Sequence, residues 1–240
     1  MIKYITVLTK SCKNKGYCVA GIDEMTQRLV RLVSEDVNTQ GALQNEHILY
    51  PSGAQMQIFD KIAVEVTHNQ NLWYQPENFV VKSNMYLGYR GKATLPEIRQ
   101  ALMQPEFIFY NTDKSILPQD IQRQMVKSSL QFVEVQTLVL RIDNYDENRI
   151  YANFLYNNRW YNYFKITDYE LTKKYHANIL REGQITLHNA MIVFSLAGMY
   201  RDGKHYKLVA NIIEQQSHRV PRLAPTPTLI ELDWEEEIEL

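Results

Sequence analysis

An aromatic stretch between Asn148 and Asp168 constrains the fold of this chain more than any other part of the sequence. Seven aromatic residues fall within fourteen positions, in two runs on either side of Asn157 and Asn158. Asn tolerates the positive φ angles that a two-residue type I′ turn requires, and aromatic and β-branched residues favour strands. The pattern therefore predicts a β-hairpin that turns at the Asn pair.

The two faces of this hairpin follow from the turn, because directly opposed residues share one face of a sheet. The apolar face, expected to be core, carries Leu155 with Trp160, Tyr151 with Phe164, and Ile166. The other face pairs Tyr156 with Arg159, Phe154 with Tyr161, Ala152 with Tyr163, and Ile150 with Lys165. Its tyrosines and cations are typical of a surface that stacks bases and neutralises phosphates. The alternative is that the aromatic pairs only stabilise the sheet.

Short strand patterns recur along the rest of the chain. They are expected at residues 3–9, 17–22, 28–33, 59–67, 130–142, 191–196 and 206–213. A basic loop is expected over residues 10–16, and a capping box at Thr94 and Glu97 predicts a helix from Leu95 to Met103. Further helices are expected from Pro118 to about Gln124 and, with Asp168 at its start, to about Tyr175. The inventory is mainly β with short helices, an α+β class.

The charge of the chain is distributed unevenly. Six acids and no base stand in the last ten residues, so the net charge of −1 becomes +5 without them. The N-terminal region is the most positive part, and its candidate phosphate contacts are Lys10, Lys13, Lys15, Arg28 and Arg31. This is the footprint of a polyanion binder whose acidic tail would compete for the same surface. The alternative is a tail that is only a solvated end.

Chemistry-bearing motifs are scarce. The nine glycines are scattered singly, the six histidines lie far apart, and Cys12 and Cys18 match no zinc or redox spacing. No enzyme, cofactor or metal is therefore predicted. No apolar run approaches the roughly 18 residues of a membrane span, and no signal-peptide pattern opens the chain, so a cytoplasmic location is expected. The tetrad from Gln75 to Asn78 is interpreted as a turn fixed by Pro76, with base-edge contacts by Gln75 and Asn78 as the alternative.

Periodicity alone leaves OB-type barrels, SH3-like barrels and sandwiches open. Several segments resemble a family of prokaryotic proteins that carry a dual OB-fold domain: Cys18–Gly21, Arg28–Ser34, Gln75–Asn78, Arg149–Asp168, Ser195–Leu196 and Tyr206–Ala210. The resemblance implies two tandem small OB-like barrels joined by a helical connector. The boundaries expected are 1–92 and 128–216 for the barrels, 93–127 for the connector, and 217–240 for a Pro-containing linker and acidic tail.

Three functions remain open. The first is non-catalytic binding of single-stranded nucleic acid or a nucleotide, with the N-terminal cations on phosphates and with Tyr156, Arg159, Tyr161 and Tyr163 stacking bases. The second is a scaffold subunit that holds a protein partner through its acidic tail and β surfaces. The third is an enzyme that acts on nucleotides. The resemblance also suggests a setting in bacterial defence systems.

Overall fold

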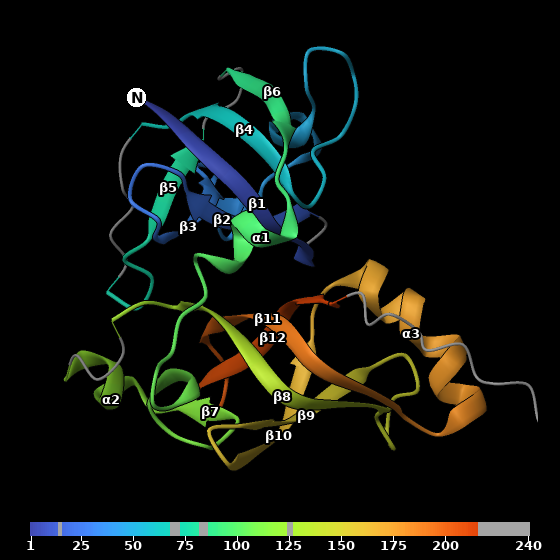
Figure 1. The fold of residues 1–240 in the computed structure, drawn as a ribbon. Coiled ribbons are helices and arrows are strands. Elements are labelled where there is room, and N and C mark those ends of the chain that lie inside the picture. Colours follow the sequence, from blue (N-terminus) through green and yellow to red (C-terminus); the bar gives the residue numbers. More distant parts are fainter. Residues whose placement is uncertain (14–15, 68–72, 82–85, 124–126, 216–240) are drawn as a thin grey trace, which may run out of the picture.

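The computed structural model describes the chain except for residues 14–15, 68–72, 82–85, 124–126 and 216–240. Two six-stranded sheets form two stacked barrel-like units, as the sequence predicts, with one helix between them and two beside the C-terminal unit (Figure 1). The first sheet contains β1 Ile2–Lys13, β2 Gly16–Asp23, β3 Leu29–Ser34, β4 Asp60–Glu65, β5 Asn78–Val81 and β6 Leu87–Lys92. The second contains β7 Ser115–Ile116, β8 Leu130–Ile142, β9 Ile150–Tyr156, β10 Arg159–Ile166, β11 Ile185–Met199 and β12 His205–Ile213.

The helices are short, apart from the last. They are α1 Leu95–Arg99, α2 Pro118–Gln122 and α3 Tyr169–Glu182, with 3-10 turns at Val37–Thr39, Asn45–Ile48 and Ile108–Tyr110. The predicted capping box is present, since the Glu97 carboxylate accepts from Thr94 N at 2.7 Å. Helix α3 runs seven residues past its expected end at Tyr175, and it stops at Gly183, whose φ of 77° suits glycine.

The two sheets repeat one strand topology. In each, three consecutive antiparallel strands form a meander, the fourth pairs with the first, and the fifth runs parallel to the third. The second unit is a closed barrel, because β11 and β12 pair with each other and β12 also pairs with β10. In the first unit, β4 and β5 do not pair in the described residues, and Thr67 N bonds Val80 O where they approach. This order is the five-stranded Greek key of the OB fold.

The segment predicted as a connector, residues 93–127, takes part in the second barrel. It supplies β7 to the sheet, and it packs Ile108, Phe109, Ile116 and Ile121 into the barrel core. It also supplies Ile98 of α1, and Ala101 just after that helix, to the contact between the barrels. Strand β1 reaches Lys13, so the basic loop expected over residues 10–16 is largely strand, because Lys10 to Lys13 pair with β2.

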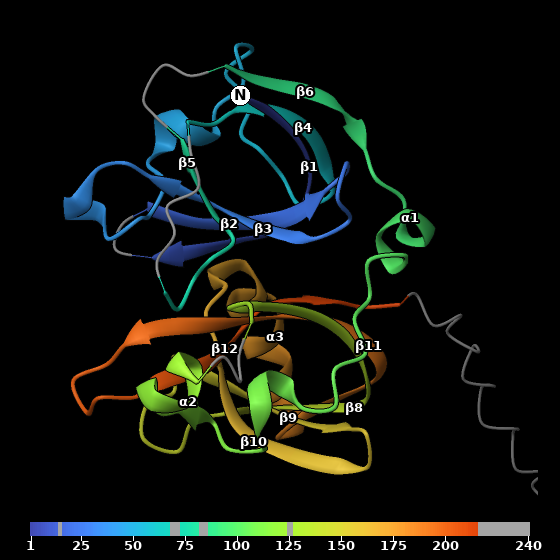
Figure 2. The same cartoon turned by 90° about the vertical axis from the view of Figure 1, so that its left-hand side faces the viewer.

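The barrels are packed against each other through an apolar interface. The outer faces of β1, β2 and β3 meet the outer faces of β8, β11 and β12, with Leu8, Ile22, Phe132 and Val193 buried between them (Figure 2). Polar bonds cross the same interface: Asn211 Nδ2 donates to Leu8 O at 2.6 Å. The relative position of the barrels is therefore fixed by core-like packing. In the part of the chain described, no helix is long and apolar enough to cross a membrane.

Candidate functional site

The aromatic hairpin forms as predicted, but its register changes halfway. Asn157 and Asn158 have φ angles of 48° and 59°, and Tyr156 pairs with Arg159 and Phe154 with Tyr161. A β-bulge then follows, so that Ala152 faces Phe164 instead of Tyr163. One extra residue in a strand turns every later side chain to the opposite face.

The predicted core face is wrong near the turn, where Tyr156 and Tyr161 are core. Beyond the bulge, Phe164 and Ile166 are core, as expected. The core face consists of Ile150, Ala152, Phe154, Tyr156, Tyr161, Phe164 and Ile166. The Tyr161 ring stacks on Phe154 at 4.9 Å, and the Tyr156 hydroxyl donates to Pro105 O at 2.6 Å. Burial raises the pKa of both tyrosines. A base cannot stack on either ring, because both lie inside the barrel.

The bulge places Tyr163 on the outer surface. Its φ is 62°, a value that L side chains rarely adopt, and Asn153 Oδ1 accepts its backbone N–H at 3.0 Å. The ring is 64% exposed and meets Tyr151 edge to face at 6.1 Å. Bulges often redirect a side chain at a functional site, and such backbone strain is a pointer to function.

A cavity of about 370 Å³ opens beside Tyr163, and we call it the inner cavity. Its lining combines cations and tyrosines without any carboxylate: Lys114, Arg149, Tyr151, Tyr163, Lys165, Thr167, Ala197, Gly198, Tyr200, Tyr206, Lys207 and Leu208. These residues come mainly from β9, β10, the start of β12 and the loops that precede β9 and β12, with Lys114 from the residue before β7 and Ala197 and Gly198 from the end of β11. In an OB fold, the face of the second and third strands and these two loops are the positions that bind oligonucleotides.

A second cavity, the outer cavity, continues from the first. It measures about 440 Å³ and shares Lys114, Tyr151 and Tyr163 with the inner cavity. Its other walls come mainly from the loop between β8 and β9: Arg141, Ile142, Asp143, Asn144, Tyr145 and Asn153. Together the two cavities form a groove on one face of the C-terminal barrel, called the aromatic groove below.

The inner cavity is electrostatically positive. Burial, and then the nearby positive charge of Arg149, lower the pKa of Lys165, and Asp146 acts in the opposite direction. Asp146 forms an ion pair with Arg149 at 2.7 Å. The Lys165 ammonium itself donates no hydrogen bond to any residue in the described part of the chain. An anion entering the cavity would offset the repulsion between Lys165 and Arg149.

Lys207, which lines the inner cavity, is hydrogen-bonded to residues 108–111 of the segment between the barrels. Its ammonium is buried and donates at 2.7 Å to Ile108 O, Asn111 O and Asn111 Oδ1. Burial lowers its pKa to about 7, with a small opposing effect of Asp113. Since its three donors are occupied, Lys207 fixes residues 108–111 against the barrel and is not available to a ligand.

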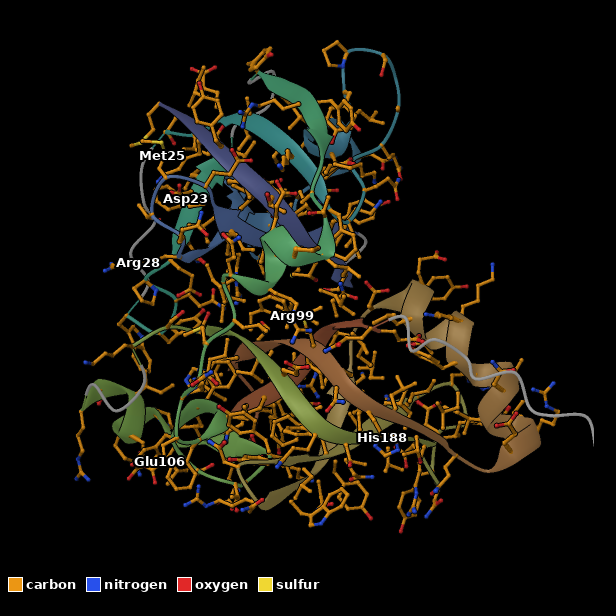
Figure 3. The ribbon with its side chains drawn as sticks, viewed as in Figure 1. Asp23, Met25, Arg28, Arg99, Glu106 and His188 are labelled. Atoms are coloured by element: carbon orange, nitrogen blue, oxygen red, sulfur yellow. The ribbon has the colours of Figure 1, made fainter. Side chains whose placement is uncertain are left out.

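The structure places the predicted N-terminal cations apart. Lys10 lies near one end of the first sheet, half-buried, with its ammonium 5.7 Å from the Tyr17 ring centroid. Lys13 ends β1 at the same side, and Lys15 lies outside the described residues. Arg28 is exposed at the opposite end, next to the turn of Asp23 and Met25 (Figure 3). Lys10 and Arg28, at opposite ends of the sheet, do not belong to one patch.

Arg31 lies in the interface between the barrels. Its guanidinium is 7% exposed, donates to Ser129 Oγ at 2.9 Å and Ser195 Oγ at 3.1 Å, and pairs with Glu77 at 3.7 Å. The predicted phosphate contact is corrected accordingly, because a phosphate cannot reach a buried guanidinium. Arg159 is also engaged, over the Phe107 ring at 4.4 Å and with Glu106 at 3.7 Å, and it lines neither cavity.

The tetrad from Gln75 to Asn78 also serves this interface. Gln75 Nε2 donates to Leu196 O at 3.3 Å and its Oε1 accepts from Asn78, while Glu77 accepts from Ser129. Gln75 and Asn78 are buried. The structural interpretation of this segment is the one that fits, since these polar groups bond protein partners.

Most of the cations and tyrosines of the aromatic groove were absent from the predicted site, among them Lys114, Arg149, Tyr151, Tyr200 and Tyr206. They lie up to 92 residues apart in the chain and meet only through the barrel topology. Of the predicted residues that the structure describes, Tyr163 alone lines the groove. In the OB fold, the second and third strands and two loops are known in advance as the ligand-binding positions. Applied to the predicted strands, this rule could have pointed to Arg149 and Tyr200.

Comparison with known families assigns the fold. The profile of the dual OB-containing domain family, DuOB, matches residues 3–212. The chain belongs to this family. Among curated proteins, none matches its sequence significantly.

Two solved structures are similar over most of their length. The Ifi202 HINa domain in complex with 20-bp double-stranded DNA is 7% identical, with a TM-score of 0.34 and coverage of 90% of this chain and 97% of that chain. A murine DNA-binding protein bound to double-stranded DNA is 6% identical, with the same TM-score and coverage of 90% and 98%. At these scores the likeness carries no argument about this dual OB protein.

Proposed function

We propose that this dual OB protein is a non-catalytic binder of single-stranded nucleic acid or nucleotides, and that the aromatic groove is its binding site. One observation carries the proposal: the inner cavity gathers four tyrosines with Lys114, Arg149 and Lys165 on the ligand-binding face of a closed OB barrel, and no carboxylate of the described residues lines it. Its volume of about 370 Å³ lies within the range of small-ligand sites.

The expected mode of binding combines stacking with charge neutralisation. An unpaired base would stack on the exposed ring of Tyr163, while Arg149, Lys165 and Lys114 would contact phosphates. Stacking needs a free base face, which single strands offer and an intact duplex does not. Each stacked base contributes roughly 1–3 kcal/mol, and each neutralised phosphate adds to the salt dependence.

The N-terminal barrel has a supporting role in this proposal. Its β2–β3 face, the counterpart of the β9–β10 face, contributes Ala20, Ile22 and Leu29 to the interface with the C-terminal barrel. Because the C-terminal barrel covers this face, it cannot bind a nucleic-acid strand. The C-terminal barrel therefore keeps the free OB face of the pair.

Fluorescence anisotropy of labelled single-stranded DNA and RNA tests the proposal. We expect Tyr163→Ala to weaken binding about 5- to 150-fold, as a lost stacking contact does, while the salt slope stays unchanged. Trp160→Ala is the matched control, because Trp160 is 51% exposed on the same strand but lines neither cavity. Arg149→Gln should weaken binding and flatten the slope.

No binding to either polymer or to nucleotides, at low salt, would refute the proposal. Equal losses in the Tyr163 and Trp160 variants would move the site away from the groove. The defence setting, the cytoplasmic location and a protein partner at the acidic tail stay predictions of the sequence, and the tail lies outside the described residues.

A further inference from the structure

We infer that the inner cavity binds a terminal phosphate, a phosphomonoester at the end of a strand or on a free nucleotide, in preference to an internal phosphodiester. This inference rests on the proposed function and names the ligand class of the same site. The observations that carry it are the charge balance of the cavity, a cation without a partner inside it, and the different lining of the outer cavity.

The charge balance of the inner cavity matches a dianion. Four cations line it, but Asp146 pairs with Arg149, and Asp113 lies within electrostatic reach of Lys207. The two acids offset two of the four positive charges, and neither Lys114 nor Lys165 forms an ion pair with a described residue, although Asp146 also acts on Lys165 from a distance. A phosphomonoester carries a charge of about −1.5 to −2 at pH 7, whereas each internal phosphate of a strand carries one negative charge.

Lys165 supplies the unsatisfied donor that such a ligand needs. It stands on β10, where its backbone pairs with Leu208 and Tyr151, and its side chain is half-buried in the cavity wall. Its ammonium donates to no described residue, although it is partly removed from water. A phosphate oxygen that accepted from it would form a charge-assisted hydrogen bond, which is about twice as strong as a neutral one.

The outer cavity is less positive than the inner one, because Lys114 and Arg141 share its lining with Asp143. Its lining includes Asp143 and the amides of Asn144 and Asn153, and its Arg141 is engaged by Gln184 Oε1 at 3.0 and 2.7 Å. These polar groups suit a sugar or a base edge better than a second phosphate. The groove therefore has a direction: the terminal phosphate lies in the inner cavity, and the strand leaves over Tyr163 and Tyr151 into the outer cavity.

The test compares three single-stranded DNA 8-mers of one sequence, with a 5′-phosphate, a 3′-phosphate, or no terminal phosphate. We expect one of the phosphorylated ends to bind at least about tenfold more tightly than the unphosphorylated strand. Lys165→Gln should remove that preference and leave the affinity of the unphosphorylated strand nearly unchanged. Lys173→Gln, an exposed lysine of α3 that lines neither cavity, is the control.

Two further arms make the result decisive. Adenosine monophosphate is added as competitor, and its displacement of the phosphorylated strand with similar affinity would identify a free nucleotide as the source of the same phosphomonoester. Lys114→Gln, at an exposed site, replaces Lys165→Gln if circular dichroism shows that the β10 variant is unfolded.

Equal affinities for all three 8-mers would overturn the inference while leaving the proposed function intact. A preference that survives both lysine variants would also overturn it, because the phosphate would then bind elsewhere. Absence of binding to every strand and to the nucleotide would instead refute the proposed function itself.

Discussion

Replacement of Arg31 by leucine tests whether this arginine stabilises the fold or binds a ligand, and we predict that it destabilises the folded protein. The guanidinium joins β3 of one barrel to Ser129 and Ser195 of the other, and its removal leaves the Glu77 carboxylate without its cation. Glu77 keeps its bonds from Ser129, which limits the loss. Breaking a buried ion pair costs about 3–5 kcal/mol, so we expect a loss near 3 kcal/mol in the free energy of unfolding.

Urea unfolding, followed by circular dichroism and by tryptophan fluorescence, measures this loss. Arg28→Leu is the matched control, because Arg28 is exposed three residues away in the chain and should change stability by less than about 0.5 kcal/mol. The double variant Arg31→Leu with Glu77→Gln should recover part of the loss, since it removes the orphaned charge. A loss below about 1 kcal/mol for Arg31→Leu, or an equal loss for Arg28→Leu, would refute the reasoning.

The remaining predictions concern Lys207 and the start of α3. The pKa of Lys207 is lowered to about 7, so above that pH the unfolded chain holds a proton that the folded chain has lost, and stability should rise by about 2–3 kcal/mol between pH 7 and 9. Urea midpoints over this range should show the rise in the wild type and not in Lys207→Met; a flat profile in both would mean that the carbonyl bonds keep the ammonium charged. Asp168→Ala should cost about 1 kcal/mol, because its carboxylate accepts from Leu171 N at 2.9 Å at the helix start. Glu170→Ala, exposed in the same turn, should cost clearly less, and equal midpoints in the two variants would contradict the cap.

Local sequence signals predicted the elements well. The Asn157–Asn158 turn, the Thr94 capping box and the Asp168 helix start each depend on neighbours within four residues, and all three are present. The family resemblance supplied the order of the barrels, which strand patterns alone left open. Those features need no knowledge of distant contacts.

The faces of the aromatic hairpin could not be predicted from alternation. A single bulge at Tyr163, stabilised by the side chain of Asn153, reverses the pattern after Tyr161. A polar side chain that bonds a neighbouring strand leaves no period in the sequence. Tyr156 and Tyr161 lie on the turn side of the bulge, and they were assigned to the surface because alternation does not show which face of a hairpin is core. The bulge then brings Phe164 and Ile166 to the same face as these two tyrosines.

The positions of the cations in space could not be predicted from the sequence either. Arg31 follows the pattern of a surface cation in its own strand, but it becomes buried because a second barrel packs on that face. The aromatic groove draws on segments around Lys114, Arg149, Tyr163 and Tyr200, which only the closed barrel brings together. The basic residues that are close together in the sequence pointed to the N-terminal barrel as the binding site. The basic residues that line a cavity together, Lys114, Arg149 and Lys165, lie on the C-terminal barrel.

Mapping the bound strand onto the protein tests the central claim most directly. Single-stranded oligonucleotides with 5-iodouracil at one position would be cross-linked by ultraviolet light to the full chain, and the attached residues identified by mass spectrometry. The account predicts attachment at Tyr163, Tyr151 or Tyr200 of the aromatic groove, lost when Tyr163 is replaced. Attachment confined to the β1–β2 hairpin around Lys10 and Tyr17 would contradict it and return the site to the N-terminal barrel.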